Sequence, residues 1–494
     1  MDKYDLCVIG AGPSGYAAAM RAIDFNKKVL LIEKGPIGGV GITNGALSSK
    51  TWWELARNVR LLYKNKKRYG LSSPEVNFEE LRDEVEDAVS ERKSMLMDHI
   101  TNLQGSRFEN LITYKVGSAK MKSATLIDIV DGDGNLETIE ANYTILATGS
   151  RPRKIPSIPI DEKIVLTSEG IDKLKGFPKS IVIVGAGVIG CEFATIFSSL
   201  QKTKVHLIDK GDRILPFEDE DVVKVIEENM EKSNVLIHRN SQMIRMEVID
   251  GEVEYELEYS NGRKETFHVE KALVSIGRVP NYENLGLEDI GVKMDARGII
   301  DNDTCTSVSN IFAVGDITAD IALVNVGELE GRYAVEKIFG KPIHNLVYEN
   351  ISTIMFLNPE VAGVGLNEAQ AKQKGIDYVM ASVDYSCISR AIAKRNTQGF
   401  IKMLVTNDDE MKVLGLRVVG NHASSAMQAT ALLISMNAGI HEIAECVHPH
   451  PSITEGIQEC VRLLMGKSLF KPEALNDKLM RKVSVNGEVK NLMV

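Results

Sequence analysis

The chain has 494 residues, 44% of them hydrophobic, and a formal net charge of −10 at pH 7. Its length and hydrophobic content predict about two to four domains with substantial cores. The negative charge argues against a nucleic-acid partner, and no apolar run approaches the roughly 18 residues of a membrane-spanning helix. A strand signal begins at Tyr4, so we expect no targeting peptide.

The six cysteines are scattered along the chain without CxxC spacing. Reduced, buried thiols fit this distribution better than a disulfide framework, so we expect a cytoplasmic protein. Cys446, His448 and His450 lie within five residues of one another but lack the spacing of a closed metal site. No bound metal is expected.

Residues 4–33 are typical of a nucleotide-binding βαβ unit. The apolar run 4–10 predicts a buried parallel strand, and a helix at 17–22 and a second strand at 29–33 follow it. The turn GAGPSG at 10–15 would let backbone N–H groups approach a pyrophosphate at the helix N-terminus. Glu33, at the end of the second strand, is placed to accept hydrogen bonds from ribose hydroxyls. A tight turn without a ligand is the structural alternative.

Residues 181–209 repeat this layout, with the glycine turn GAGVIG at 185–190 and an acid, Asp209, after the second strand. Such an acid favours the free 2′-hydroxyl of NAD over the 2′-phosphate of NADP. Lys210 and Arg213 keep NADP as the alternative.

The other segments follow from their patterns. Apolar residues at helical spacing predict a long structural helix at 78–103, and short strands with polar turns are expected at 111–146 and 244–276. From about residue 346 the pattern predicts a separate α+β domain with strands at 400–405 and 412–419, a helix at 423–438, and a polar tail at 467–494 with an Asn486-Gly487 hairpin turn.

Four further motifs are ATGS at 147–150, VSIGRVPN at 274–281, IFAVGD at 311–316 and HPHPSITE at 448–455. With the two glycine turns they resemble, in order and over residues 4–466, the motifs of the class I pyridine nucleotide-disulfide oxidoreductases. That family includes dihydrolipoamide dehydrogenase, glutathione reductase, mercuric reductase and soluble transhydrogenase.

The resemblance implies an α/β protein with two Rossmann-like dinucleotide-binding domains, for FAD and NAD(P), and a C-terminal α+β dimerisation domain. A homodimer is expected. The implied boundaries are 1–150 with 277–345 for the FAD domain, 151–276 for the NAD(P) domain, 346–466 for the interface domain and 467–494 for the C-terminal tail.

The resemblance also assigns catalytic roles. Lys50 would lie beside the flavin N5 atom and pair with Glu192, where a cation stabilises reduced flavin. His450 would act as a proton-transferring base oriented by Glu455, and would reach the flavin pocket of the opposite subunit. A solvated Lys50 and an inherited dyad without remaining chemistry are the alternatives.

The cofactor-binding residues implied for FAD are Gly10, Gly12, Ser14, Gly15, Glu33, Gly38, Gly39, Lys50, Ala119, Thr148, Gly149, Gly315 and Asp316. Those implied for NAD(H) are Gly185, Gly187, Gly190, Glu192, Asp209 and Gly277.

The loop at 38–50 departs from the family pattern. Where the family has two cysteines that form a disulfide against the flavin, this chain has Gly41 and Ala46, and neither can carry electrons. Ser48 stands where the family usually has proline. Trp52 or Trp53 could form an aromatic wall for a flat acceptor, but packing in the core is the alternative that we favour.

These observations predict an FAD-dependent NAD(P)H oxidoreductase that passes electrons from reduced flavin directly to a small, non-disulfide acceptor such as a quinone, dye, metal ion or nicotinamide. Dihydrolipoamide dehydrogenase activity is expected to be absent. The alternatives are a soluble NAD(P) transhydrogenase and a non-catalytic flavin-binding sensor or scaffold subunit.

Overall fold

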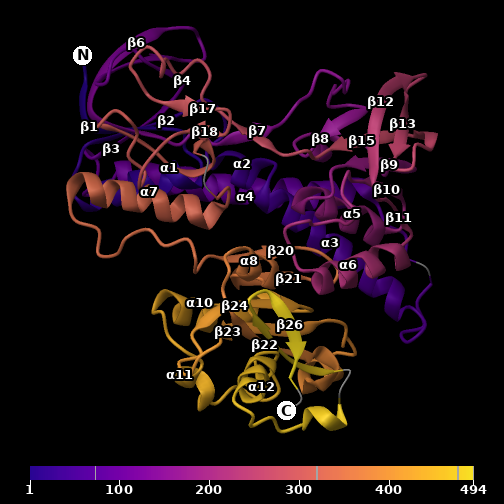
Figure 1. Cartoon of the computed structure of the whole chain (residues 1–494). Helices are drawn as coiled ribbons and strands as arrows, with labels where there is room; N and C mark the ends of the chain where they lie inside the picture. Colours follow the sequence, from indigo (N-terminus) through magenta and orange to yellow (C-terminus); the bar gives the residue numbers. More distant parts are fainter. Residues whose placement is uncertain (73, 319–320, 476–477, 493–494) are drawn as a thin grey trace. The chain divides into compact units, whose positions relative to one another are not determined.

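The computed structural model describes residues 1–72, 74–318, 321–475 and 478–492. The chain folds into two compact units (Figure 1). Unit 1 contains residues 1–178, 245–254 and 268–346, and unit 2 contains residues 179–244, 255–267 and 347–494. The domain boundaries expected from the sequence stay a prediction.

Unit 1 is built on a sheet with strand order β3-β2-β1-β6-β5-β4, in which β19 also pairs with β6. The pairs among β3, β2, β1, β6 and β19 are parallel, whereas β4 and β5 are antiparallel. Leu6, Cys7 and Val8 of β1 are fully buried, as expected for a central strand covered on both faces. The strands are β1 (Lys3–Ile9), β2 (Val29–Glu33), β3 (Ile112–Val116), β4 (Ser118–Met121), β5 (Leu126–Val130), β6 (Leu136–Leu146) and β19 (Ile311–Ala313).

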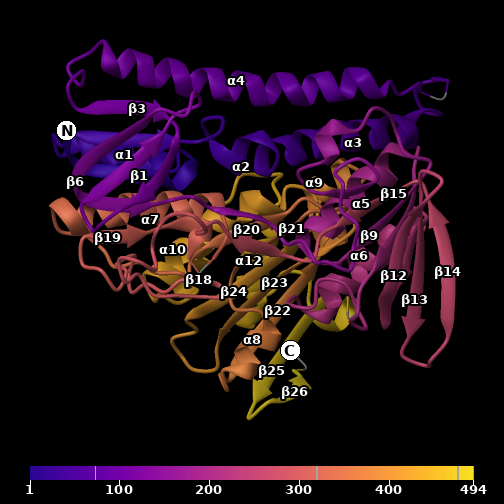
Figure 2. The same cartoon turned by 90° about the horizontal axis from the view of Figure 1, so that it is seen from above.

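The helices of unit 1 include the predicted long helix. That prediction is confirmed by α4 (Phe78–Gln104), which lies beside α3 (Ala46–Asn65) (Figure 2). Helices α1 (Pro13–Asp24) and α7 (Val324–Phe339) approach closely at Gly331, where an added Cβ would lie 2.2 Å from a backbone oxygen of α1. The remaining elements are α2 (Gly39–Thr43), β7 (Ser150–Pro152), β8 (Val165–Thr167), η1 (Ile171–Lys173), β15 (Lys271–Val274), β16 (Arg278–Pro280), β17 (Met294–Asp295), β18 (Gly298–Ile299) and η2 (Gly315–Ile317).

Unit 2 contains the second predicted βαβ layout. Its strands β9, β10 and β11 are parallel in the order β11-β10-β9. Helix α5 is buried over all residues from Gly190 to Leu200, which fits a helix that is apolar around its circumference. The elements are β9 (Ser180–Val184), α5 (Val188–Leu200), β10 (Lys204–Ile208), α6 (Glu220–Lys232) and β11 (Val235–His238).

Two histidines on β10 and β11 are covered by aromatic side chains. Strands β12 (Ser241–Ile249), β13 (Glu252–Tyr259) and β14 (Lys264–Val269) form a three-stranded sheet. Two tyrosines of β13 reach the histidines, with Tyr255 OH 2.6 Å from His206 Nδ1 and Tyr259 OH 2.8 Å from His238 Nδ1. Burial lowers the pKa of His206 to about 4 and also lowers that of His238.

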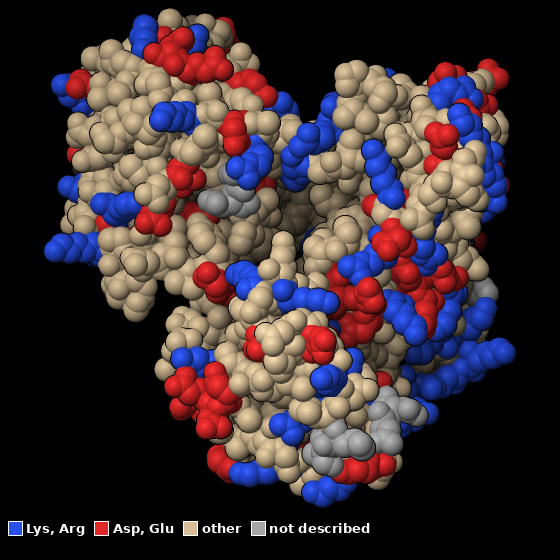
Figure 3. Space-filling view, viewed as in Figure 1, with Lys and Arg blue, Asp and Glu red and all other residues tan. Residues whose placement is uncertain are grey.

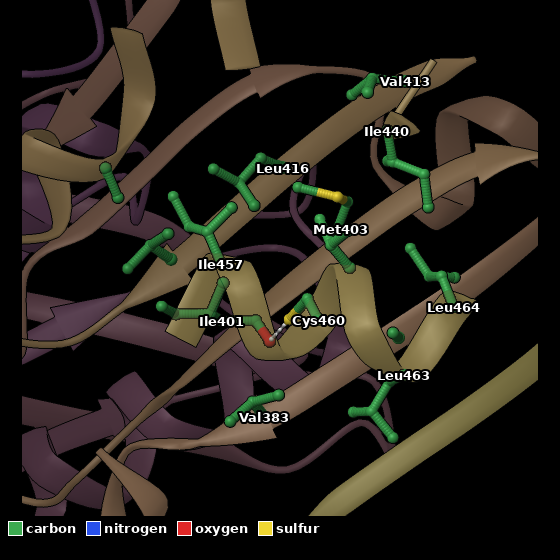
Figure 4. Close-up of a cluster of buried hydrophobic side chains, with 14 of the residues drawn as sticks. Val383, Ile401, Met403, Val413, Leu416, Ile440, Ile457, Cys460, Leu463 and Leu464 are labelled. Atoms are coloured by element: carbon green, nitrogen blue, oxygen red, sulfur yellow. Dashed lines mark hydrogen bonds between the residues drawn. The ribbon is translucent and has the colours of Figure 1, made fainter. Parts of the chain in front are cut away.

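The C-terminal sheet has seven antiparallel strands in the order β20-β21-β24-β23-β22-β25-β26. Helix α12 packs on this sheet, where Ile457 and Cys460 meet Ile401 and Met403 (Figure 4). The elements are β20 (Ser352–Met355), β21 (Val361–Gly365), α8 (Glu368–Gln373), β22 (Tyr378–Asp384), η3 (Tyr385–Cys387), α9 (Ser389–Ala393), β23 (Phe400–Thr406), β24 (Val413–Val419), η4 (Ala423–Ala426), α10 (Met427–Ser435), α11 (His441–Ala444), α12 (Glu455–Leu464) and η5 (Pro472–Ala474).

The helix expected at 423–438 is shorter than predicted. Residues 423–426 form a 3₁₀ turn, and α10 covers only Met427–Ser435. Asn437 has a φ of +51°, and this left-handed residue just beyond the helix stops it.

The tail forms two strands, β25 (Leu479–Val485) and β26 (Glu488–Asn491), that extend the edge of the C-terminal sheet. Asn486 and Gly487 between them have φ values of +50° and +79°, which confirms the predicted hairpin turn. Leu479 is buried, whereas β26 is exposed along its length.

Among the described residues, no helix is long and apolar enough to cross a membrane. Acidic and basic side chains are interspersed on the face seen in Figure 3. The net negative charge therefore does not gather into one continuous acidic surface on that face.

Candidate active site

The first glycine turn connects β1 to α1, and its geometry requires glycine. Gly10 has a φ of +105°, and a Cβ there would lie 2.4 Å from the Ala147 carbonyl oxygen. A Cβ on Gly15 would lie 1.9 Å from the carbonyl oxygen of Gly10. By contrast, no atom lies within 4 Å of a Cβ placed on Gly12. The turn therefore leaves open space before the N-terminus of α1, which suits a phosphate.

Glu33 and Asp209 make matching hydrogen bonds in the two nucleotide-binding units. Glu33 accepts from the Ala11 N–H at 2.7 Å, and Asp209 accepts from the Ala186 N–H at 2.8 Å. The second oxygen of each carboxylate accepts from the N–H two residues further along, at 2.9 Å in both cases. Each acid lies at or just beyond the end of the second strand of its unit, and it is hydrogen-bonded to the glycine turn that follows the first strand.

The second glycine turn, at 185–190, also leaves open space in front of its helix. Gly185 has a φ of +102°, and nothing lies within 4 Å of a Cβ on Gly187. Of the two basic residues that kept NADP open, Arg213 forms an ion pair with Glu220 at 3.4 Å, whereas Lys210 is exposed.

Asp316 is held by a hydrogen-bonded chain. Its Oδ2 accepts from Ser150 Oγ at 2.7 Å, and Arg278 Nε donates to the same Ser150 Oγ at 2.8 Å. A Cβ on the neighbouring Gly315 would lie 2.3 Å from Ser14 Oγ, so this motif contacts the first glycine turn. The predicted residues from three segments therefore meet at the carboxyl ends of β1, β6 and β19, where open parallel sheets bind ligands. The motifs contained Ser150 and Arg278, but sequence reasoning gave them no role.

The other predicted cofactor residues lie at the same sheet or next to it. Thr148 Oγ1 donates to the Asn281 carbonyl at 2.6 Å, and Asn281 Nδ2 donates back to the Thr148 carbonyl at 3.0 Å. Gly149 and Gly277 take positive φ values of +68° and +101°. Ala119 lies on β4.

The loop that departs from the family pattern packs on the first glycine turn. Gly38 and Gly39 have φ values of +92° and +56°, and a Cβ on Gly39 would lie 3.1 Å from Gly12 Cα. A Cβ on Gly41 would lie 2.9 Å from Pro13 Cγ. The backbone at position 41 therefore sits too close to the Pro13 ring to accept a side chain without a shift.

Lys50 and Glu192 lie in different units. Lys50 Nζ donates to Ser49 Oγ at 3.3 Å. Glu192 is buried, and its Oε1 accepts from the Phe356 N–H at 3.0 Å. Their expected pairing stays a prediction.

Both tryptophans of the chain are buried, with 3% of Trp52 and 4% of Trp53 exposed. Trp52 packs against Phe78 at a ring-centroid distance of 5.6 Å, and its Nε1 donates to Asp172 Oδ1 at 2.8 Å. Trp52 therefore packs in the core, which is the alternative that the sequence favoured. No local pattern could have identified Asp172, because it lies 120 residues from its partner.

The expected dyad is formed. Glu455 is the first residue of α12, and its Oε1 lies 2.7 Å from His450 Nδ1. Its other oxygen accepts from the Ser452 N–H at 2.8 Å. Burial raises the pKa of Glu455, but the hydrogen bonds from His450 and Ser452 outweigh it and leave the pKa lowered. The carboxylate is thus fixed and ionised, as an orienting partner for an imidazole must be.

A group of three acids, Asp219, Asp221 and Glu368, has the spacing of a metal site. The ammonium group of Lys402 lies among them, at 2.7, 2.8 and 2.9 Å from their oxygens. Burial lowers the pKa of Lys402, but the three carboxylates outweigh it and raise the pKa. The protein thus supplies its own cation at this position.

The fold and the site together define a protein with two glycine turns of the dinucleotide-binding type. The sequence profile of the pyridine nucleotide-disulphide oxidoreductases matches residues 4–331, and that of their dimerisation domain matches residues 351–461. The chain belongs to this family, which uses FAD and NAD(H).

Similar proteins include a dihydrolipoyl dehydrogenase of Geobacillus stearothermophilus, 33% identical over 93% of this chain and 96% of the relative. A leghemoglobin reductase of Glycine max is 28% identical over 94% of this chain and 88% of the relative. Among solved structures, LpdA from Mycobacterium tuberculosis has a TM-score of 0.85 at 23% identity, covering 94% of this chain and all of that one. The Cu(II) complex of the HOCl-induced flavoprotein disulfide reductase RclA from Escherichia coli has a TM-score of 0.82 at 22% identity, with the same coverage.

Proposed function

We propose that the protein is an FAD-dependent NAD(P)H oxidoreductase that delivers electrons from the flavin to a small, non-disulfide acceptor. One observation carries this proposal: the loop at 38–50 has Gly41 and Ala46, which lack thiols, while both glycine turns for cofactor binding are complete. When bound, FAD would supply the hydride and electron chemistry, and the proposal concerns the route by which electrons leave it.

The loop geometry supports this route. Neither a hydrogen atom nor a methyl group can form a disulfide or attack one. The Pro13 ring already occupies the space beside position 41. All six cysteines are unpaired, and Cys7, the nearest in sequence to the loop, is fully buried in β1, where burial raises the pKa of its thiol. The dihydrolipoyl dehydrogenases that this chain resembles are named for a reaction of a dithiol substrate. We propose that this chain does not share that reaction.

The dyad supports proton transfer to an acceptor. His450 is exposed, with 69% of its side chain accessible, while Glu455 holds one of its ring nitrogens. An imidazole oriented in this way can deliver protons near neutral pH. A quinone or dye takes up protons with its electrons, so the dyad is suited to this class of acceptor.

A soluble NAD(P) transhydrogenase is the second candidate. The exposed Lys210 beside Asp209 favours it, because a cation there can contact a 2′-phosphate while the acid serves NAD. A transhydrogenase also needs no thiols, since the two nicotinamides can use one site in turn.

The test is an anaerobic two-step experiment on the FAD-loaded, full-length protein. NADH or NADPH is added and the flavin absorbance is followed; then lipoamide, a water-soluble quinone, Cu(II) or a nicotinamide analogue is offered. The proposal expects bleaching by NADH without a long-wavelength thiolate charge-transfer band, and rapid reoxidation by an acceptor other than lipoamide.

The other outcomes separate the alternatives. Turnover of lipoamide at ordinary dehydrogenase rates would contradict the proposal. Reduction by both nucleotides with reoxidation only by the nicotinamide analogue identifies a transhydrogenase. If neither NADH nor NADPH bleaches the flavin, the protein is a sensor or scaffold subunit.

A further inference from the structure

A buried carboxyl group joins a distant segment to the helix that follows the flavin loop. Asp172, on the 3₁₀ turn η1, accepts a hydrogen bond from Trp52 Nε1 at 2.8 Å and another from the hydroxyl group of Ser48. Ser48 and Trp52 are 2% and 3% exposed. They lie four residues apart on α3 and therefore share one face of that helix.

At the N-terminal end of α3, Ser49 Oγ donates to the Gly45 carbonyl at 2.6 Å, and α2 packs beside the helix. Gly45 at its N-cap position makes no side-chain capping bond. The residues before it include Gly38, Gly39 and Gly41, and glycine backbones are conformationally permissive. No disulfide closes the loop, because positions 41 and 46 lack thiols.

A single carboxyl group that binds two donors one helical turn apart fixes both the rotation and the position of the helix. Aromatic packing also holds the segment around Asp172 against the helices. The ring centroids of Trp52 and Phe78 lie 5.6 Å apart, and Phe177 packs edge-on to Phe78 at a centroid distance of 5.0 Å. Phe177 lies five residues beyond Asp172, so the segment is attached to the helices at two points.

Burying the carboxyl group of Asp172 in this contact is electrostatically unfavourable. Burial raises the pKa of Asp172, the hydrogen bonds from Trp52 and Ser48 lower it, and Glu86 on α4 raises it again. Burying a carboxyl group is unfavourable unless it is well bonded. An apolar side chain would fill the space at lower cost but would not fix the rotation of the helix.

Lys50 lies two residues after Ser48 and hence on the opposite side of α3. We propose that Asp172 is a positioning residue, which holds the first turns of α3 so that Lys50 is presented to the flavin. Asp172 would replace part of the constraint that a disulfide would give, because no disulfide closes the loop at 38–50. This inference rests on the proposed function, because the place of Lys50 beside the flavin comes from the family resemblance.

The experiment compares Asp172→Leu and Asp172→Asn with the wild type, using FAD-loaded, full-length protein. The flavin midpoint potential and absorption spectrum are measured by chemical reduction with dithionite, which needs neither NADH nor an acceptor. Asp87, an exposed acid on α4, provides matched controls as Asp87→Leu and Asp87→Asn.

Displacement of the Lys50 cation removes stabilisation from the reduced flavin. We therefore expect Asp172→Leu to shift the potential to a more negative value and to perturb the spectrum. The rate of flavin reduction by NADH should fall about tenfold or more, as expected for a mispositioned group. Asp172→Asn retains an acceptor for Trp52 and should recover most of each property, and the Asp87 variants should match the wild type.

Milder variants keep the test decisive if Asp172→Leu fails to fold. Ser48→Ala and Trp52→Phe each remove one donor, and each should shift the potential in the same direction by a smaller amount. The inference is overturned if tryptophan emission reports a broken Trp52–Asp172 bond while the potential and spectrum stay those of the wild type. If NADH fails to reduce even the wild-type flavin, the proposed function is wrong, and the dithionite comparison still tests Asp172.

Discussion

The side chain of Lys402 is completely buried. It lies far from the cofactor turns in sequence and has no part in the proposed reaction. Its value is structural. It neutralises part of the charge of three acids that come from the N-terminus of α6 and from α8, and so joins these helices to β23.

Lys402→Met should strongly destabilise the protein. Removing one partner of a buried ionic group costs about 3–5 kcal/mol of unfolding free energy, since the carboxylates are left without a cation. Without the ammonium group, burial raises the pKa of Asp219 in the folded state, because Lys402 no longer offsets it. The loss of stability should therefore be largest at pH 7 and smaller at pH 5. Denaturant titrations at both pH values measure it, with the exposed Lys490→Met as control, and an equal loss at both would contradict the explanation.

Glu455→Gln tests the dyad at the level of one atom. Because glutamine is neutral, it holds the His450 ring less well in the proton-donating orientation. Reoxidation of the flavin by a proton-requiring acceptor should slow about tenfold or more. Reduction by NADH should keep its rate, and stopped-flow measurement separates the two steps. Glu442→Gln, which changes an exposed acid of α11, is the control; equal slowing of both steps would argue against a role on the acceptor side.

At the scale of elements, the sheet β12-β13-β14 covers two histidines whose pKa values are lowered. The neutral form of each is favoured in the folded protein. Between pH 6.5 and about 4 the unfolded chain therefore binds more protons than the folded one, and the unfolding free energy falls as the pH drops through this range.

His206→Phe should weaken that pH dependence. The variant loses the bond to Tyr255 and is less stable at pH 7, but its stability should fall less between pH 7 and 4.5 than that of the wild type. Denaturant titrations across this range provide the measurement. His268→Phe, which removes an exposed histidine, should leave the slope unchanged. An unchanged slope in His206→Phe would show that other groups carry the pH dependence.

The terminal hairpin protects the edge of the C-terminal sheet. A chain that ends at Lys478 loses β25 and exposes the paired edge of β22 together with the pocket of Leu479. Unpaired edges promote aggregation, so this variant should melt several degrees lower and scatter light in a concentration-dependent manner. A chain that ends at Gly487 keeps β25 but loses the exposed β26 and the partly buried Leu492, so it should be destabilised less than the shorter chain; equal damage in both truncations would contradict this account.

Features whose residues lie close together in the sequence can be predicted from it, whereas contacts between residues far apart in the sequence cannot. The two glycine turns were predicted because their residues lie within a few positions of one another, whereas the dyad was expected because the motif at 448–455 resembles that of a known family. Lys402 and Asp172 were not, since Lys402 appeared as part of a strand and its partner Asp219 lies 183 residues away. Even α10 ended early for a reason that periodicity alone does not show, the left-handed Asn437.

For the whole molecule, the dimerisation domain predicts a homodimer with about twice the 54.4 kDa mass of the chain. If each dyad serves the flavin site of the other subunit, mixed dimers of Lys50→Ala and Glu455→Gln contain one intact site. Random subunit exchange should then raise the activity of two impaired proteins to about a quarter of the wild-type value. Light scattering confirms the dimer, and the absence of any recovery in proven mixed dimers would show that each subunit uses its own dyad.

The contact between Gly41 and Pro13 has a consequence for protein engineering. A cysteine introduced at position 41 alone must push the Pro13 ring aside and would find no second thiol in this loop. A cysteine at position 46 alone would equally lack a partner there. Only the two substitutions together could place a dithiol in this loop. A cysteine pair built into this loop would therefore need room at Pro13 as well as changes at positions 41 and 46.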